Sequence, residues 1–184
     1  HNIKIGRIVD LIAYRRDKDK FVKKIHDSKV KIKSNFEFDI KIYESLFDNT
    51  EQIVLSKGNI DNGMPVMVRV HVTDYFDNLF GEYGSDDASL NKSVEVIQEH
   101  ERGILVLIRD SGKSIINRLI TNSSSGDNKS ENEKDELRIY GMGAQILSEL
   151  GVKEMILLTN TEWKFIGLEA YGINIIETRL LSEL

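Results

Sequence analysis

A short apolar run constrains the fold of this chain more than any other feature of its sequence. The run covers residues 103–109 (GILVLIR) and is not interrupted by a polar side chain before its last position. Such runs are typical of strands that are covered on both faces, as in layered α/β proteins. The chain has 184 residues, 40% of them hydrophobic, and is therefore long enough to build such layers around one core.

The segments around this run predict further strands and helices. Residues 34–60 and 65–72 alternate apolar and polar side chains, which is the pattern of half-buried strands. Helical spacing and apolar stretches then alternate along the chain: helices are predicted over 88–101, 140–151 and 161–172, and strands over 153–160 and 173–180. This order indicates an α/β (α+β) fold, with antiparallel N-terminal strands followed by alternating strands and helices that pair partly in parallel.

The remaining segments predict helices at the N-terminus and two loops. Apolar residues at helical spacing between Ile8 and Ile25 predict one amphipathic helix or two. Gly103 is expected to end the helix over 88–101. Residues 75–87 are polar, aromatic and glycine-containing, which predicts a loop. Residues 121–135 contain no hydrophobic side chain, so we expect a mobile loop there.

The charge of the chain is distributed unevenly. Residues 1–33 carry a net charge of +7, whereas the rest carries −12. A basic end can indicate nucleic acid binding, but the apolar stripe in the same residues favours a solvated helix that faces an acidic neighbour. No apolar run approaches the ~20 residues that span a bilayer. We therefore expect neither a nucleic acid nor a membrane partner, and the absence of cysteines and of a signal peptide favours a cytoplasmic location.

Six motifs, in this order and spacing, resemble the GTP cyclohydrolase II family. They are VLSKGNI at 54–60, PVMVRVH at 65–71, ERGILVLIR at 101–109, RIYGMGAQILSELGV at 138–152, LLTN at 157–160 and GLEAYGINIIE at 167–177. The resemblance implies an enzyme of riboflavin synthesis that opens the imidazole ring of GTP and releases formate and pyrophosphate. It also implies a homodimer.

The N-terminal residues resemble a second enzyme of the same pathway. Residues 1–28, which begin HNIKIGRIVDLIAYRR, are similar to the C-terminal end of 3,4-dihydroxy-2-butanone 4-phosphate synthase, often fused in front of GTP cyclohydrolase II. We therefore expect residues 1–30 to be a remnant of the synthase domain and residues 31–184 to form the GTP cyclohydrolase II-like domain. The chain would then be the second half of a bifunctional riboflavin protein.

The resemblance implies a zinc ion held by three cysteines, but the chain contains no cysteine. The three positions align with Asp74, Gly84 and Asp86, and a register shift of one residue would replace the last two by Ser85 and Asp87. Glycine offers no ligand atom, and carboxylate oxygens prefer Mg²⁺ or Ca²⁺ to zinc. We therefore expect the family's zinc cofactor to be absent.

Two interpretations of the acidic residues in this region remain. One is a replacement metal site, and the other is an ordinary polar loop. The acidic and imidazole side chains that could build the replacement site are His71, Asp74, Asp77, Asp86 and Asp87.

Other positions of the family's site are retained unevenly. The phosphate-binding pattern corresponds to RDSGK at 109–113, where Gly112 permits close backbone approach and Lys113 keeps a charge without the bidentate fork of arginine. By resemblance, Arg138 matches the catalytic arginine and Glu136 its proton acceptor. The remaining expected nucleotide contacts are Arg69, His71, Thr159 and Lys164. Taken singly, these residues also have structural explanations, such as a surface ion pair between Arg138 and Glu136.

Three functions fit these observations. The first is a degenerate GTP cyclohydrolase II-like domain that cannot open the ring and that supports the fused synthase structurally or by binding a nucleotide. The second is an active GTP cyclohydrolase II with a different metal site, and the third is a pure interaction or dimerisation module. The expected partners are GTP or another nucleotide or anion, the fused synthase domain and a second copy of the chain.

Overall fold

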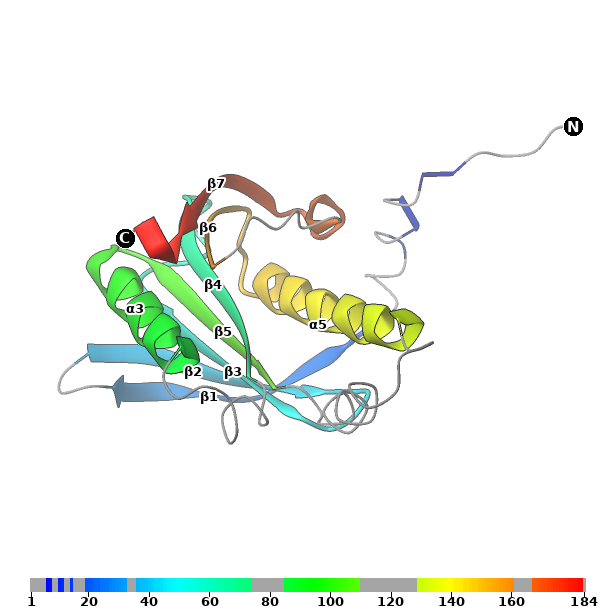
Figure 1. Cartoon of the computed structure of the whole chain (residues 1–184), viewed down its shortest axis with the longest axis horizontal. Coiled ribbons are helices and arrows are strands. Elements are labelled where there is room, and N and C mark those ends of the chain that lie inside the picture. Colours follow the sequence, from blue (N-terminus) through cyan, green and yellow to red (C-terminus); the bar gives the residue numbers. More distant parts are fainter. Residues whose placement is uncertain are drawn as a thin grey trace, which may run out of the picture.

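One mixed β-sheet forms the centre of the molecule (Figure 1). The computed structural model describes residues 6–7, 10–11, 14, 19–32, 36–73, 85–109, 129–160 and 167–183. The strands of this part are β1 (Val22–Ile32), β2 (Phe36–Ser45), β3 (Glu51–Lys57), β4 (Val66–Thr73), β5 (Gly103–Arg109), β6 (Glu154–Thr159) and β7 (Asn174–Leu180). The helices whose bounds are defined are α3 (Ser85–Glu99), α5 (Lys129–Glu149) and the short 3₁₀ helices η2 (Leu168–Tyr171) and η3 (Leu181–Glu183).

The strand order is β1-β2-β3-β5-β4-β6-β7. The pairs β1–β2, β2–β3 and β3–β5 are antiparallel, whereas β4 runs parallel to both of its neighbours, β5 and β6, and β7 runs parallel to β6. The predicted α/β class, with an antiparallel N-terminal half and partly parallel pairing behind it, is therefore confirmed. None of the helices in the described ranges is both long and apolar enough to cross a membrane.

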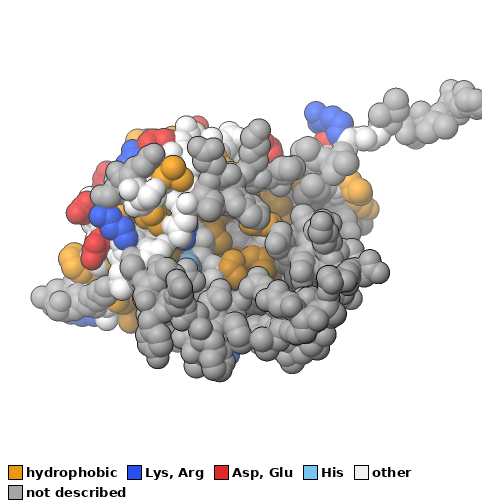
Figure 2. All heavy atoms as spheres, in the orientation of Figure 1, with side chains coloured by type: hydrophobic (Ala, Val, Ile, Leu, Met, Phe, Trp, Pro, Cys, Tyr) orange, Lys and Arg blue, Asp and Glu red, His pale blue; other side chains and the backbone are white. Residues whose placement is uncertain are grey.

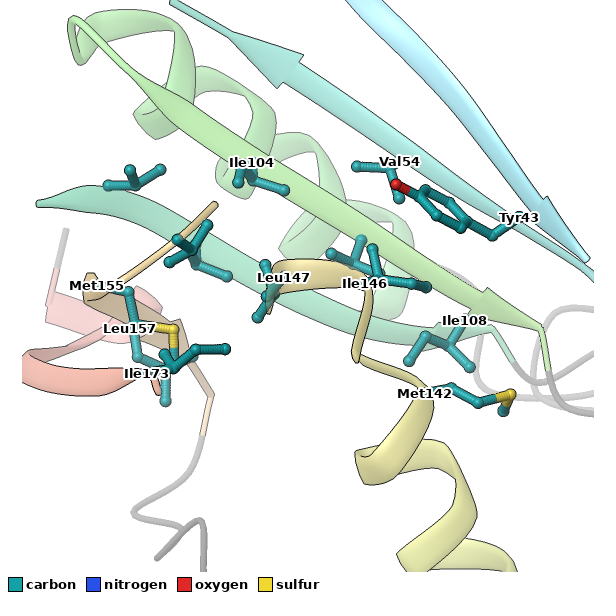
Figure 3. Close-up of a cluster of buried hydrophobic side chains, with 14 of the residues drawn as sticks. Tyr43, Val54, Ile104, Ile108, Met142, Ile146, Leu147, Met155, Leu157 and Ile173 are labelled. Carbon is teal, nitrogen blue, oxygen red and sulfur yellow. The ribbon is translucent and has the colours of Figure 1, made fainter. Parts of the chain in front are cut away.

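Helices α3 and α5 cover opposite faces of the sheet (Figure 1). Because successive residues of a strand point to opposite faces, β4 and β5 supply side chains to two separate cores. Val68 and Ile104 pack with Ile146 of α5, and part of this cluster is drawn in Figure 3. Met67 and Leu105 pack with Ile97 of α3. This double coverage explains why residues 103–109 are apolar without interruption.

The N-terminal helix prediction is confirmed at the described residues 10, 11 and 14, which are helical, but it is wrong around Val22 and Ile25, because Val22 begins β1. The register of β1 with β2 shifts between Lys24 and His26, so Ile25 is an extra residue on the bulged strand. A β-bulge breaks the two-residue alternation of side chains. Because the alternation is broken, Phe21, Val22 and Ile25 have the spacing of one face of a helix although they lie in or next to a strand.

The last residues of both predicted loops, 75–87 and 121–135, are helical. Helix α3 begins at Ser85 and not at 88, and α5 begins at Lys129, so residues 129–135 are helical. Lysine and glutamate are good helix formers, and extending an anchored helix needs no new nucleus. A segment can therefore be helical without hydrophobic side chains. The helix predicted over 161–172 is only partly described: residues 161–166 lie outside the described ranges, and Leu168–Tyr171 form a single 3₁₀ turn.

Two glycines set how closely helices approach the sheet. Gly103 was expected to end a helix but is the first residue of β5, where a Cβ atom would lie 2.6 Å from Ile97 Cγ2. Gly143 lies within α5, and a Cβ atom there would meet Ile108 Cδ1 at 3.3 Å. Both glycines therefore serve packing, in addition to any effect on the backbone.

Tyr43 provides a pH-dependent probe of the core around α5. Burial, with Glu149 and Asp27 adding negative charge, raises the pKa of the Tyr43 phenol to about 12. When folding raises the pKa of a phenol, the free energy of unfolding is unaffected below the unfolded pKa of about 10. It falls as the pH rises from there toward the folded pKa.

We therefore expect the free energy of unfolding to fall by up to about 1.4 kcal/mol per pH unit between about pH 10 and 12. Urea unfolding across this range measures the fall. The Tyr43→Phe variant is the control, since it should lose stability less steeply; equal slopes in both proteins would contradict the assignment.

Candidate functional site

The carboxyl edge of β4 and β5 is a topological switch point. The two strands are parallel neighbours, with Thr73 of β4 opposite Arg109 of β5. Along the chain, β4 is followed by α3, which covers one face of the sheet, and β5 is followed by α5, which covers the other (Figure 1). In open α/β sheets, ligands bind at the carboxyl ends of strands where the connections diverge in this way. We name this edge, from Thr73 to Arg109, the switch edge.

Buried polar side chains lie close to the switch edge on the α3 side. Arg69 is 7% exposed and donates hydrogen bonds to Leu158 O at 3.2 Å and to Ser89 Oγ at 3.5 Å. Ser89 is itself hydrogen-bonded to the Asn160 side chain. Arg69 therefore ties β4 to the end of β6 and to α3, a role that the sequence did not predict. Its expected role as a nucleotide contact stays a prediction.

The structure brings two further predicted contacts to the same region. His71 is 9% exposed and lies two residues beyond Arg69 on the same face of β4. Thr159 is 7% exposed and ends β6, the other neighbour of β4. In the view of Figure 2, hydrophobic side chains of the described residues lie in the middle and charged ones gather toward α3 and β7. The polar groups of the switch edge thus come from β4, β5 and β6 together.

A buried glutamine fixes the end of β5. Gln52, fully buried in β3, accepts a hydrogen bond from the backbone N–H of Arg109 at 2.6 Å. Its amide donates to Thr50 Oγ1 at 2.7 Å, and the Thr50 hydroxyl donates to Asp48 Oδ1 at 2.8 Å. Sequence reasoning missed Gln52. The available signal was a glutamine at the start of the apolar stretch IVLS, where a polar side chain needs a partner.

Arg138 lies on the N-terminal half of α5 with an exposed side chain. Its guanidinium carbon is 5.6 Å from the centroid of the Phe47 ring. That ring is in turn 5.3 Å from the ring of Phe21. The predicted catalytic role of Arg138 stays a prediction, and the structure adds a cation–π contact that sequence reasoning did not foresee.

Several predicted site residues lie outside the described residues or are described only as backbone. Asp74, Gly84, Gly112, Lys113 and Lys164 are in the first group. Glu136 and Asp86 are helical positions of α5 and α3. The roles predicted for all of these residues are therefore untested.

The donor set of the chain does not fit the zinc site that the resemblance implies. No thiol exists anywhere among the 184 residues. Among the residues that the structure describes, no group of three or more His, Asp or Glu side chains could hold a metal ion. The three positions aligned with the cysteines supply two carboxylates and a glycine, which are not a ligand set for tetrahedral zinc.

The sheet order and its two covering helices define an α/β domain with buried polar side chains near the ends of β4 and β6. The sequence model of the GTP cyclohydrolase II family matches residues 23–179, and the chain belongs to this family.

Proteins of riboflavin biosynthesis are similar to nearly the whole chain. The monofunctional riboflavin biosynthesis protein RIBA 3, chloroplastic, of Arabidopsis thaliana is 35% identical over 96% of this chain and 36% of its own length. The bifunctional protein RIBA 1, chloroplastic, of the same plant is 34% identical over 96% of this chain and 34% of its own length. The chain thus spans about a third of the length of these relatives.

A solved structure shares the fold. The crystal structure of RibBX, a two-domain 3,4-dihydroxy-2-butanone 4-phosphate synthase from A. baumannii, superimposes with a TM-score of 0.56 at 24% identity. It covers 97% of this chain, which in turn covers 46% of that protein.

Proposed function

We propose that this chain is a GTP cyclohydrolase II-like domain that cannot carry out zinc-dependent ring opening and that supports a fused synthase. The observation that carries the proposal is the absence of every thiol ligand from a chain of this family. Ring opening by water at neutral pH needs an activated nucleophile, because free water has a pKa of about 15.7. The carboxylates at the aligned positions are hard ligands and do not restore the zinc site.

The supporting role consists of binding a nucleotide or another anion at the switch edge, or of stabilising the fused protein as a homodimer. Arg69 and His71 lie near the end of β4, Thr159 ends β6, and the segment with Gly112 and Lys113 follows β5. Phosphate binding depends on such donors and on positive charge, which can be kept when the metal ligands are lost.

The proposal includes a division of the chain and a location. Residues 1–30 would belong to the end of a synthase domain and residues 31–184 to the domain described here, although β1 runs across the division. One Arabidopsis relative is named as monofunctional and the other as bifunctional, so proteins similar to this chain include both kinds. Both relatives are chloroplastic proteins, whereas we propose a cytoplasmic location for this chain.

An assay of formate release tests the lost activity. We expect the purified chain, supplied with GTP and zinc or magnesium, to release no formate above the buffer control. An active GTP cyclohydrolase II serves as the positive control. Formate release, or zinc at one equivalent after gel filtration, would overturn the proposal.

Calorimetry with GTP, GDP and pyrophosphate separates the two supporting roles. Saturable binding that is lost in Lys113→Ala and Lys164→Ala identifies a nucleotide or anion site. The absence of binding leaves the purely structural role.

A further inference from the structure

The turn between β2 and β3, which we call the hub turn (residues 46–50), contacts three separate parts of the molecule. Its own backbone is closed by hydrogen bonds from Ser45 N to Thr50 O at 2.8 Å and from Asn49 N to Ser45 O at 3.0 Å. Asn49 has φ +56°, a left-handed conformation that asparagine tolerates better than most residues. The hub turn is therefore a defined structure that can transmit a displacement.

On one side, the hub turn holds the switch edge. Asp48 and Thr50 orient Gln52, and Gln52 accepts the hydrogen bond from Arg109 N. Arg109 is the last residue of β5, so this bond fixes the point from which the segment with Gly112 and Lys113 departs. A shift of the turn would change the direction of the Arg109 N–H group.

On the other side, the hub turn holds the segment that leads into the domain, residues 19–22, which we call the lead-in. Leu46 N donates to Phe21 O at 2.9 Å, and the Phe47 ring packs against the Phe21 ring. The lead-in is also held by α5: Gln145, 6% exposed, accepts hydrogen bonds from Phe21 N at 2.7 Å and from Val22 N at 3.3 Å. The Gln145 amide donates to Asp19 O at 3.3 Å.

Helix α5 completes the connection. Positions 138, 141 and 145 are three and four residues apart and therefore share one face of the helix. Gly141 leaves room for the Phe21 ring, since a Cβ atom there would lie 3.3 Å from Phe21 Cε2. Arg138, one turn before Gly141, lies over Phe47. The lead-in, the hub turn and Arg138 thus form one contiguous set of contacts.

We propose that the lead-in controls the geometry of the switch edge through the hub turn, so that Phe47 and Gln52 are positioning residues for Arg109 and Arg138. A change in the polypeptide upstream of residue 19 would then reach the switch edge, and an anion bound at that edge would in return stabilise the docked lead-in. The part of this inference that concerns an anion rests on the proposed function, whereas the coupling itself does not.

Amide exchange of the full chain, followed residue by residue by NMR, tests the coupling. We expect Phe47→Ala to accelerate exchange of the Arg109 amide by about five- to tenfold, the size of a typical coupling between sites. Phe36→Ala is the matched control, because Phe36 is 48% exposed and Phe47 52% exposed, and Phe36 lies at the opposite end of β2. This control should leave the Arg109 amide unchanged.

A second background shows whether the effect passes through Gln52. In Gln52→Ala the Arg109 amide has already lost its acceptor, so adding Phe47→Ala should accelerate its exchange no further. Phe47→Leu keeps the apolar bulk if the alanine variant unfolds, and it should show a smaller acceleration in the same direction. An Arg109 amide that exchanges at the wild-type rate in folded Phe47→Ala or Phe47→Leu would overturn the proposal.

Pyrophosphate binding provides the second measurement. We expect Phe47→Ala to weaken pyrophosphate binding about fivefold, and Phe36→Ala to leave it unchanged. If the wild-type chain does not bind pyrophosphate, the anion-binding part of the proposed function fails, and the exchange measurements alone decide the coupling. Equal pyrophosphate affinity of wild type and Phe47→Ala would contradict the inference.

Discussion

Replacement of Gly103 by alanine is expected to lower the free energy of unfolding by about 1–3 kcal/mol, the usual cost of overpacking a core. The new Cβ atom would lie 2.6 Å from Ile97 Cγ2 and 3.3 Å from the backbone oxygen of Met67. Ile97 is fully buried, and a β-branched side chain has few alternative rotamers, so the contact cannot be relieved cheaply. Relief requires α3 to move away from the sheet.

Urea unfolding of Gly103→Ala and of Gly6→Ala measures this effect with a matched pair. Gly6 has no atom within 4 Å of the position of an added Cβ, so its substitution should be close to neutral. In an Ile97→Ala background the Gly103→Ala substitution should cost less, because the clashing methyl group is gone. If Gly103→Ala lowers the free energy of unfolding by the same amount in the Ile97→Ala background, the contact with Ile97 is not the cause.

Restoring three cysteines is expected to restore zinc. The triple variant Asp74→Cys, Gly84→Cys, Asp86→Cys should hold about one zinc per chain after gel filtration, since three protein ligands and one water complete a tetrahedral site. The parent chain should hold none. Because the alignment allows a one-residue shift, the triple variant Asp74→Cys, Ser85→Cys, Asp87→Cys covers the second register.

Metal analysis and the absorption of a cobalt-substituted sample measure the result. A variant with only two of the three cysteines is the control and should hold much less zinc. Equal zinc content in the parent and in both triple variants would contradict the proposal that thiol loss removed the metal. Regain of formate release is a separate question, because Lys113 and Glu136 also depart from the family pattern.

The layered architecture could be predicted because its strongest signals are local. The uninterrupted run of β5 and the alternation in β4 each follow from which faces of a strand are covered. The prediction failed at β1, where one extra residue, Ile25, broke the alternation, and only pairing with β2 reveals the strand. It failed again at the start of α5, because residues 129–135 lack hydrophobic side chains and were therefore predicted to be a loop.

The candidate site was predictable only as far as single residues could be matched to a motif. Arg69, His71 and Thr159 were expected at the site and lie near the ends of β4 and β6. Gln52 and Gln145 were missed, because their partners are backbone groups 57 and more than 120 residues away along the chain. No local sequence pattern identifies a side chain that hydrogen-bonds to a backbone group far away along the chain.

The contacts of Gln145 have a consequence for how such domains can be recombined with other proteins. A truncation that started the chain at β1 would remove the peptide groups of residues 19–21 and leave the buried Gln145 amide without most of its partners. Each buried polar group left unmatched costs about 1–3 kcal/mol. A foreign sequence fused to β1 must therefore adopt the backbone conformation of residues 19–21 for the domain to keep this stability.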